Sequence, residues 1–309
     1  MITSVRVATK PDAAALAALV DAQELGADPN ATPMTEANAI DLMTGYIDPS
    51  DGYLLSIDGE EGFSAAVMLH PDSVKRKFFT DVYVHPRIED YGQVIDWALE
   101  KAAAEHPDWG MWPGVNSLDA RLKAAWEAAG FEFKRKYNTM RVHFTEKQTE
   151  RHVEGLTIEA IDPRNEVQLR EMHAVHQDSF SGHFDFTPRP FEAWRNLMAV
   201  EEASSDPNGY FLARLNGVPA GLCVCSNEIV DLNRGFVWVL GVAHSAHGRG
   251  IGEALLRNAL VYFESRGLVG ADLTVDTGNE SGALRLYEKV GFTAESSWIQ
   301  MAKDNWSNL

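Results

Sequence analysis

The stretch 236-FVWVLGVAHSAHGRGIGEALL-256 runs from an apolar, strand-like segment through a glycine-rich turn into an amphipathic helix. The first N–H groups of a helix have no intrahelical partner, and the helix dipole adds partial positive charge there. Gly248, Gly250 and Gly252 remove the Cβ atoms that normally crowd such a helix end, and glycine tolerates the φ values of a tight turn. We therefore expect this turn to bind an anion such as phosphate, with Arg249 adding a direct charge. Taken alone the motif is weak, because it is neither a P-loop nor a dinucleotide fingerprint.

The segments on either side of the turn strengthen this interpretation. Gly241 lies inside the strand-like run and predicts a bulge or a close approach of another backbone. A strand that separates from its neighbour offers N–H and C=O groups to an amide-bearing ligand. Further on, Tyr287 lies at the edge of the apolar stripe of a predicted helix over 280–290. Such a tyrosine is either a half-buried core residue or a phenol that can protonate a leaving group.

The order of predicted elements occurs twice along the chain of 309 residues. In the first copy the patterns predict strands over 4–8, 52–57, 63–69 and 79–85 and helices over 11–24, 35–46, 91–105 and 117–129. In the second copy they predict strands over 156–161, 210–215, 219–226, 236–242 and 271–275 and helices over 164–178, 190–200, 251–266 and 280–290. The Gly-Phe pairs that close the copies, at 130–131 and 291–292, are 161 residues apart. This period indicates a duplicated domain, and the polar segment 145-TEKQTERHVEG-155 is the predicted connection.

The two copies differ at the positions that matter for chemistry. Where the second has 247-HGRGIGEA-254, the first has 87-RIEDYGQV-94 with one glycine, and Trp126 stands where the second has Tyr287. We therefore predict a degenerate N-terminal domain over 1–146, a linker over 147–155 and a catalytic C-terminal domain over 156–309. The first copy is not expected to bind the same ligand tightly.

Composition narrows the classes of partner. A net charge of −18 argues against a nucleic-acid backbone as partner, since phosphate binding needs a basic surface. Cys223 and Cys225, two apart in an apolar run, are expected to be small buried residues, which suits a reducing cytoplasm. His173 and His176 have no third ligand nearby, so we predict no metal site. The N-terminus has no signal pattern and no apolar run is long enough to span a membrane, so a cytoplasmic protein with no membrane partner is expected.

A strand ending in Val, then R/Q-x-x-G-x-G/A opening a helix, then a helix with a tyrosine four residues before Gly-Phe, resembles the acetyl-CoA-binding core of the GCN5-related N-acetyltransferases (GNAT) from Phe236 to Phe292. Two such domains with a degenerate first copy are similar to the mycothiol-synthase-like tandem acetyltransferases. The stretch 176-HQDSFSGHFDFTPRPFEAW-194 also resembles the acceptor-side loop of that group. The implied fold is mixed α/β (α+β), with a largely antiparallel sheet in each domain, flanking helices and a splayed cofactor cleft.

The resemblance also implies roles for individual residues. Backbone groups of Leu240, Gly241 and Val242 would pair with the pantetheine arm, and Tyr287 would be the general acid that protonates the CoA thiolate. The other implied cofactor-binding residues are His247, Gly248, Arg249, Gly250, Ile251, Gly252 and Glu253 around the pyrophosphate, with Asn279 and Ala283 at the next helix. The implied reaction is direct attack of an amine on the thioester in a ternary complex.

The chain departs from the pattern at three positions. His247 replaces the usual Arg or Gln, Asn279 lies one residue further from the tyrosine than is common, and Phe236 stands where mycothiol synthase carries a glutamate as candidate base. The chain is therefore not expected to be that enzyme itself. His183 is the best-shaped candidate base, because a histidine titrates near neutral pH, while Glu228, Asp231 or water remain alternatives.

Aromatic residues indicate the character of the acceptor pocket. Its predicted walls are Phe184, Phe186, Trp194, Phe236 and Trp238, although most of these residue types also suit a core. The expected function is an acetyl-CoA-dependent N-acetyltransferase acting on the primary amine of a small molecule, as a monomer or homodimer. Two alternatives stay open: a non-catalytic acyl-CoA-binding sensor or scaffold, favoured by Phe236, and acetylation of a protein lysine or N-terminus.

Overall fold

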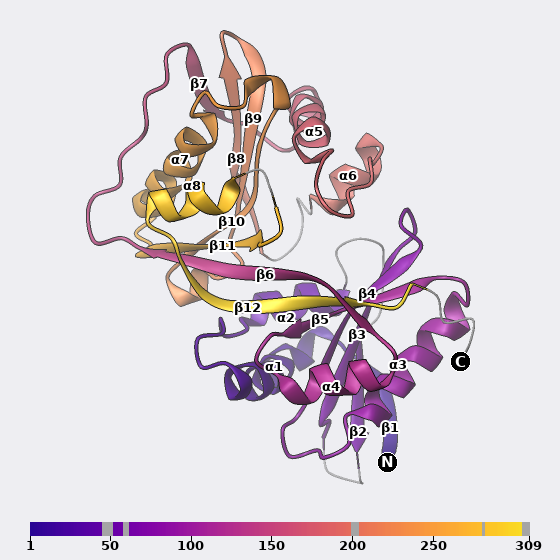
Figure 1. Cartoon of the computed structure of the whole chain (residues 1–309). Helices are drawn as coiled ribbons and strands as arrows, with labels where there is room; N and C mark the ends of the chain where they lie inside the picture. The colour runs from indigo at the N-terminus through magenta and orange to yellow at the C-terminus, as the bar shows by residue number, and fades with distance from the viewer. Residues whose placement is uncertain (45–51, 58–61, 199–203, 280–281, 305–309) are drawn as a thin grey trace. The chain divides into compact units, whose positions relative to one another are not determined.

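The computed structural model describes residues 1–44, 52–57, 62–198, 204–279 and 282–304. The ends of the predicted helices at 45–46 and 199–200, and the start of the one at 280–281, lie outside the described residues. The chain forms two compact units. Unit 1 comprises Met1–Asn138, Asp276–Gly278 and Glu295–Leu309, and unit 2 comprises Thr139–Val275 and Asn279–Ala294. In each unit, helices lie on both faces of the strands (Figure 1).

Unit 1 is built on a sheet that is antiparallel from β1 to β4. Its elements are β1 (Ile2–Val7), α1 (Ala13–Ala27), α2 (Glu36–Thr44), β2 (Gly52–Ile57), β3 (Ala65–Asp72), β4 (Lys77–Val84), α3 (Gly92–Glu105), β5 (Gly110–Asn116), α4 (Ala120–Ala128) and the first part of β6 (Glu132–His143). β4 pairs with β5 in parallel from Lys77 to Thr80. β12 (Thr293–Ala302), from the other end of the chain, then pairs antiparallel with β5.

Unit 2 repeats this order. Its elements are β7 (Leu156–Ala160), α5 (Glu166–Phe180), α6 (Phe191–Leu197), β8 (Ser205–Leu215), β9 (Val218–Ser226), β10 (Gly235–Val242), α7 (Ile251–Ser265), β11 (Gly270–Asp276) and α8 (Ala283–Val290). β7 to β10 are antiparallel neighbours, and β11 is parallel to β10. The helices α7 and α8 lie on one face of this sheet and α5 and α6 on the other (Figure 1). The mixed, largely antiparallel fold predicted from the sequence is confirmed.

The sequence of α7 explains how it covers its face of the sheet. Ile251, Leu255, Ala259 and Phe263 recur at helical spacing, and all are buried. They pack in one cluster with Cys223 and Cys225 of β9, which are both buried and free, as expected.

Three strands are absent from the sequence prediction: β5, β6 and β12. β5 contains two glycines and a proline, and the apolar alternation of β6 is interrupted by charges. β12 also decides which residues belong together, because its Trp298, Ile299 and Gln300 pair with β5, so the end of the chain completes unit 1. The boundaries 1–146, 147–155 and 156–309 therefore remain a prediction. In the compact units, β6 and β12 are each divided between unit 1 and unit 2.

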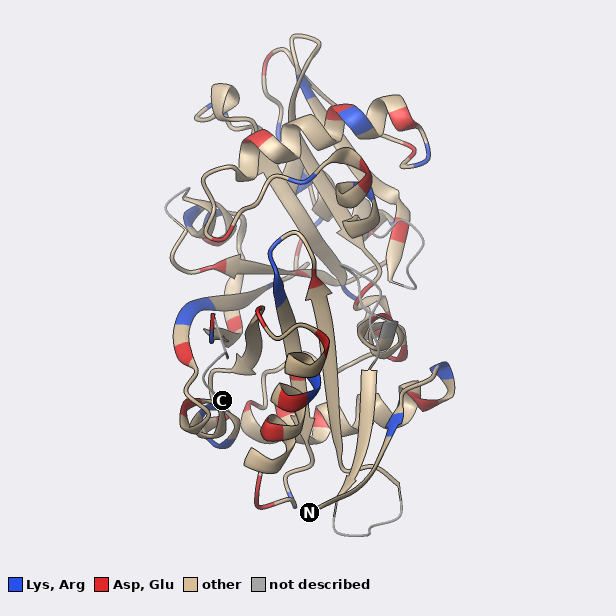
Figure 2. Ribbon diagram, turned by 90° about the vertical axis from the view of Figure 1, so that its right-hand side faces the viewer, with Lys and Arg blue, Asp and Glu red and all other residues tan. Residues whose placement is uncertain are grey.

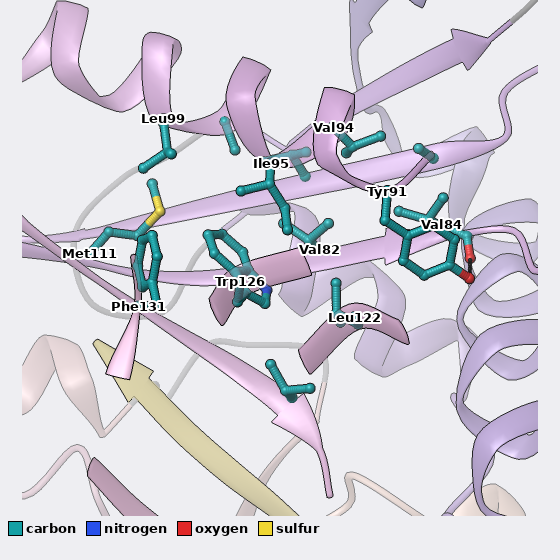
Figure 3. Close-up of a cluster of buried hydrophobic side chains, with 14 of the residues drawn as sticks. Val82, Val84, Tyr91, Val94, Ile95, Leu99, Met111, Leu122, Trp126 and Phe131 are labelled. Carbon is teal, nitrogen blue, oxygen red and sulfur yellow. Dashed lines mark hydrogen bonds between the residues drawn. The ribbon is translucent and has the colours of Figure 1, made fainter. Parts of the chain in front are cut away.

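The core of unit 1 shows what replaced the predicted site residues in the first copy. Trp126 is completely buried and its ring lies 4.6 Å from that of Phe131 (Figure 3). Tyr91, in the segment that corresponds to the glycine turn, is buried and donates its hydroxyl to the carbonyl of Val84 at 3.2 Å. These positions are occupied by packed side chains in unit 1.

Candidate functional site

β10 leaves its parallel neighbour halfway along its length. Its pairing with β11 covers Gly235, Phe236 and Val237, whereas its pairing with β9 continues to Val242. Between Val237 and Val239 the register on the β9 side shifts, which marks a bulge. Within the described residues, β10 and β11 are thus unpaired toward the end of β10, as expected for a splayed cleft.

The bulge lies at Trp238, three residues before the glycine that predicted it. Trp238 and Val239 both pack with the α5 side, so the alternation of faces is reversed from there to Val242. Gly241 itself pairs regularly with Leu222. The close neighbours of Gly241 are side chains and not another backbone, since a Cβ atom there would lie 2.5 Å from Oγ of Ser179 and 3.0 Å from the Phe180 ring.

The turn after β10 has the geometry of an open anion cradle. Gly248 and Gly250 have φ values of 75° and 79°, a left-handed conformation that favours glycine, and Gly250 is the N-cap of α7. Nothing lies within 4 Å of a Cβ placed on Gly248, so the backbone there is accessible. His247 is exposed, and its role as a phosphate ligand stays a prediction. Its Nε2 donates to the carbonyl of Val242 at 2.8 Å and holds the turn against the strand end.

The remaining residues of the predicted cradle lie in the first turn of α7. Ile251 is buried in the core, and a Cβ on Gly252 would lie 3.2 Å from Leu286 of α8, so this glycine allows close packing of the two helices. Arg249 lies in the turn between the two left-handed glycines. The Glu253 side chain is buried, and its carboxylate pairs with Arg151, Arg257 and Lys289.

Tyr287 lies on α8 beneath the β9–β10 pair. It is buried, and desolvation, with a smaller contribution from Cys223, raises its pKa above the ordinary value, so the phenol stays protonated at neutral pH. Cys223 pairs in register with Leu240, which places the phenol near the level of Leu240 on the α7–α8 face. Asn279 and Ala283 precede it, Ala283 being the first residue of α8 and packed against the same core.

The opposite face of β10 is covered by the end of α5, which carries a group of stacked rings. Phe180 lies against Gly241, and the His183 ring packs edge-on to Phe180 with 4.6 Å between centroids. The His176 ring also stacks on Phe180, with 4.6 Å between centroids. Burial lowers the pKa of His176 to about 4, with further lowering from His173 and His183. His183 is therefore separated by one ring from the strand end.

The predicted aromatic walls fall into two groups. Phe184 is exposed and Phe186 half-buried, both in the loop after α5, and Phe236 and Trp238 are half-buried on the α5 side of β10. Trp194 is fully buried in the core, where its ring centroid lies 5.6 Å from that of His176, so it packs against His176 and does not line an exposed wall. Glu228 and Asp231 precede β10, at the far end of this strand from the turn.

Two contacts at the site involve residues that the sequence did not indicate. The Asp178 carboxylate at the end of α5 accepts a hydrogen bond from the His244 backbone N–H at 2.7 Å and lies 3.5 Å from His244 Nδ1. The Arg151 guanidinium, from the predicted linker, lies over Gly250 and pairs with Glu253. An acid at the end of a helix and an arginine in a polar linker carry no periodic signal, so only the structure brings them to the turn.

The corresponding backbone groups of unit 1 have side-chain partners within that unit. Val84 is the counterpart of Val242. The residue after each strand end donates its backbone N–H to the neighbouring strand's side, from His85 to the carbonyl of Ser64 in unit 1 and from Ala243 to the carbonyl of Ala220 in unit 2. The N–H of Val84 donates to Oε1 of Gln23, and its carbonyl accepts from Tyr91. The N–H of Gly92, where α3 begins, donates to Asp90 at 3.0 Å. The groups that would face a ligand are thus bonded to side chains of unit 1 itself.

The structure of unit 2 is compatible with a CoA thioester. The strand end, the left-handed glycines and the positive end of α7 match the needs of an amide-bearing arm followed by phosphate groups. No helix in the described residues is long and apolar enough to cross a membrane. The described residues also contain no group of three or more His, Cys, Asp or Glu placed to hold a metal ion.

Comparison with known proteins agrees with this geometry. The model of the acetyltransferase (GNAT) family matches residues 169–292. A mycothiol acetyltransferase from Stackebrandtia nassauensis is 30% identical over 94% of this chain and 95% of its own length. The corresponding protein from Streptomyces griseus is 25% identical over 84% of this chain and 82% of its own.

Solved structures share the fold at low identity. A GCN5-related N-acetyltransferase from Sphaerobacter thermophilus is 20% identical, with a TM-score of 0.79 over 99% of this chain and 98% of its own. A tandem GNAT protein from the clavulanic acid biosynthesis pathway is 14% identical, with a TM-score of 0.73 over 97% of this chain and 98% of its own. By its sequence relatives and its fold, the chain belongs to the GNAT family of acetyltransferases.

Proposed function

We propose that the protein is an acetyl-CoA-dependent N-acetyltransferase that acetylates the primary amine of a small molecule at the site in unit 2. The observation that carries this proposal is the separation of β10 from β11 directly before the glycine turn, a feature that remains open in unit 2. In unit 1 the matching backbone groups are bonded to Gln23, Tyr91 and Asp90. One CoA per chain is therefore expected.

Acetyl-CoA supplies the thioester carbonyl that the amine attacks. The end of β10 would hold the pantetheine arm and the turn at Gly248 and Gly250 the pyrophosphate. The amine nitrogen forms a bond to the carbonyl carbon, the C–S bond breaks, and Tyr287 gives its proton to the departing thiolate. Burial raises the pKa of Tyr287, so the phenol is protonated at neutral pH and has a proton to give.

The proton of the attacking amine needs an acceptor on the other face of β10. We assign this role to His183, which lies next to Phe180 and so next to Gly241, while Tyr287 lies on the opposite face near Leu240. Base and acid on opposite faces suit an amine that enters from the α5 side and a thiol that leaves on the α8 side. Glu228 and Asp231 lie before the start of β10, roughly 23 Å along the strand from its last residue.

The acceptor is proposed from the side chains on the α5 face. Phe184, Phe186, Phe236 and Trp238 offer apolar surface around His183, which suits a small amine with an apolar or ring-shaped body. The similar proteins named mycothiol acetyltransferase support a small-molecule acceptor. Phe236 favours a second candidate, an acyl-CoA sensor without turnover, because this half-buried side chain has no proton-accepting group.

A thiol-release assay separates these functions. The protein is mixed with acetyl-CoA and polyamines, amino sugars, amino acids or cysteinyl glycosides, and free CoA thiol is measured with a chromogenic disulfide. We expect release with one amine class and one CoA bound per chain by calorimetry. Tight CoA binding without release from any amine would favour the sensor, and no CoA binding would refute both functions.

A further inference from the structure

The segment that connects the two sequence copies lies along α7. Residues 144–155 form no helix or strand, but the N–H of Gln148 donates to both carboxylate oxygens of Glu264 at 3.1 Å. Three residues further, Arg151 forms an ion pair with Glu253 in the first turn of the same helix. The connection is therefore bonded near both ends of α7.

Glu253 gathers three cations at the start of α7. Besides Arg151, Nζ of Lys289 lies 2.6 Å and Nε of Arg257 3.1 Å from its carboxylate oxygens. The carboxylate is only 7% exposed, and these partners, Lys289 first, lower its pKa, so it is ionised at neutral pH. Three positive charges around one negative charge leave a local excess of two positive charges around Glu253.

This local excess stands out against the rest of the chain. The protein carries a net charge of −18, and acidic residues are spread along the whole ribbon (Figure 2). CoA is itself a polyanion, with a pyrophosphate and a 3′-phosphate. A chain whose summed field repels such a ligand needs a local positive site to bind it.

Arg151 is the member of this cluster that lies over the turn. A Cβ placed on Gly250 would lie 3.1 Å from Nη2, 3.2 Å from Nε and 3.4 Å from Cζ of Arg151. The guanidinium thus lies beside the N-cap of α7, with Nη1 turned to Glu253. Its side chain is 38% exposed, so it remains accessible to a ligand from solvent. A guanidinium presents N–H donors in a fork that matches phosphate oxygens.

We propose that Arg151 binds a phosphate group of acetyl-CoA, that Glu253 is the positioning residue that holds it, and that the connecting segment is therefore part of the cofactor site. This inference rests on the proposed function. It explains why an otherwise polar, irregular segment is attached to α7. It also explains why the Glu253 carboxylate is buried and paired with Arg151 in the first turn of α7.

Calorimetric titration with CoA tests the proposal on the full chain. Arg151→Ala should weaken CoA binding by about tenfold or more, the loss of one charge-assisted contact. Arg164→Ala is the matched control, because Arg164 is an exposed arginine of unit 2 that pairs with Asp162 far from the turn in sequence. The control should bind CoA as the wild type does. Equal binding by Arg151→Ala and wild type would overturn the proposal.

Donors of different length separate phosphate binding from a structural effect. With acetyl-CoA, Arg151→Ala should raise KM and leave kcat and the KM of the amine unchanged. With acetyl-pantetheine, which has no phosphate groups, the variant and the wild type should be equal. A loss of the same size with both donors would assign Arg151 a structural role instead. Titration with 3′-dephospho-CoA then identifies the phosphate, since the variant's deficit disappears if that group is the 3′-phosphate.

Glu253→Gln tests positioning against plain charge. Removal of a negative charge near a polyanion should tighten CoA binding if only the field matters. We expect weaker binding, because Arg151 and Lys289 lose their common partner. Tighter binding by Glu253→Gln would refute the positioning role. Wild-type protein that binds no CoA at all would instead refute the proposed function, which distinguishes the two failures.

Discussion

Replacement of Tyr287 by phenylalanine is the sharpest test of the proposed chemistry. The side chain is 8% exposed and packs with Phe292, whose ring centroid is 6.1 Å away. Phenylalanine keeps this ring packing and removes only the hydroxyl. A single buried hydroxyl contributes about 1 kcal/mol to the free energy of unfolding, so Tyr287→Phe should stay folded.

The effect on rate should be much larger. General acid catalysis contributes about 10² to 10⁴ in rate, which corresponds to a rise of about 3 to 5 kcal/mol in the activation barrier. Because burial raises the pKa of Tyr287, the wild type should also keep its kcat up to pH values above about 10, the ordinary tyrosine value. The expected result is a loss of at least a hundredfold in kcat with little change in the KM of acetyl-CoA.

Tyr262→Phe is the matched control. This tyrosine lies on α7 of the same unit and donates to Asp206 at 2.7 Å, with no contact to the end of β10 among those described. Tyr262→Phe should lower the free energy of unfolding and leave kcat unchanged. Thiol release at saturating acetyl-CoA and amine gives kcat, and thermal unfolding gives stability. If Tyr287→Phe keeps more than a third of the wild-type kcat, Tyr287 is not the general acid.

Three further predictions follow from single residues. Gly250→Ala forces a left-handed φ of 79° on alanine beside Arg151, so CoA affinity should fall about tenfold; Gly217→Ala, with φ of 82° and open space, should lose similar stability without changing affinity by calorimetry. Burial raises the pKa of Glu24 to about 7, so the stability contributed by the protonated carboxyl is present below about pH 4.5 and lost as pH rises through 7. In urea unfolding, Glu24→Gln should be up to about 3 kcal/mol more stable than wild type at pH 8 and equally stable at pH 4.5. Equal stability at pH 8 would contradict this. Burial lowers the pKa of His176 to about 4, so the stability contributed by the neutral imidazole is present above pH 6.5 and lost as pH falls through 4. His176→Gln should flatten the pH dependence of the melting temperature in that window. An unchanged slope would speak against a neutral buried imidazole.

Much of unit 2 could be predicted from sequence because its signals are local. The stripe of α7 and the left-handed glycines depend on residues close together in the chain, and they place the turn and the helix where the structure has them. The separation of β10 from its neighbour was likewise expected. Gly241 predicted a bulge or a close backbone approach, and the bulge occurs at Trp238, because a bulge depends on how two strands match in length and register.

Long-range contacts account for what the sequence did not indicate. β12 has a mixed, half-exposed pattern, and its place beside β5 depends on residues about 180 positions away. The N–H of Val84 in unit 1 has its partner in Gln23, which lies on a helix with no motif. Pairing of this kind is decided by packing energies that no local pattern contains.

The sequence by itself determined the duplication, the family resemblance, and which copy keeps an open glycine turn, because φ preferences and helical periodicity are properties of neighbouring residues. Only the tertiary structure decided that Tyr287 and His183 lie on opposite faces of β10. It also decided that the side chain of Arg151, in the connecting segment, lies over Gly250. The physical reason is that charge pairing and ring stacking act through space, so they join residues whose separation in the chain carries no signal.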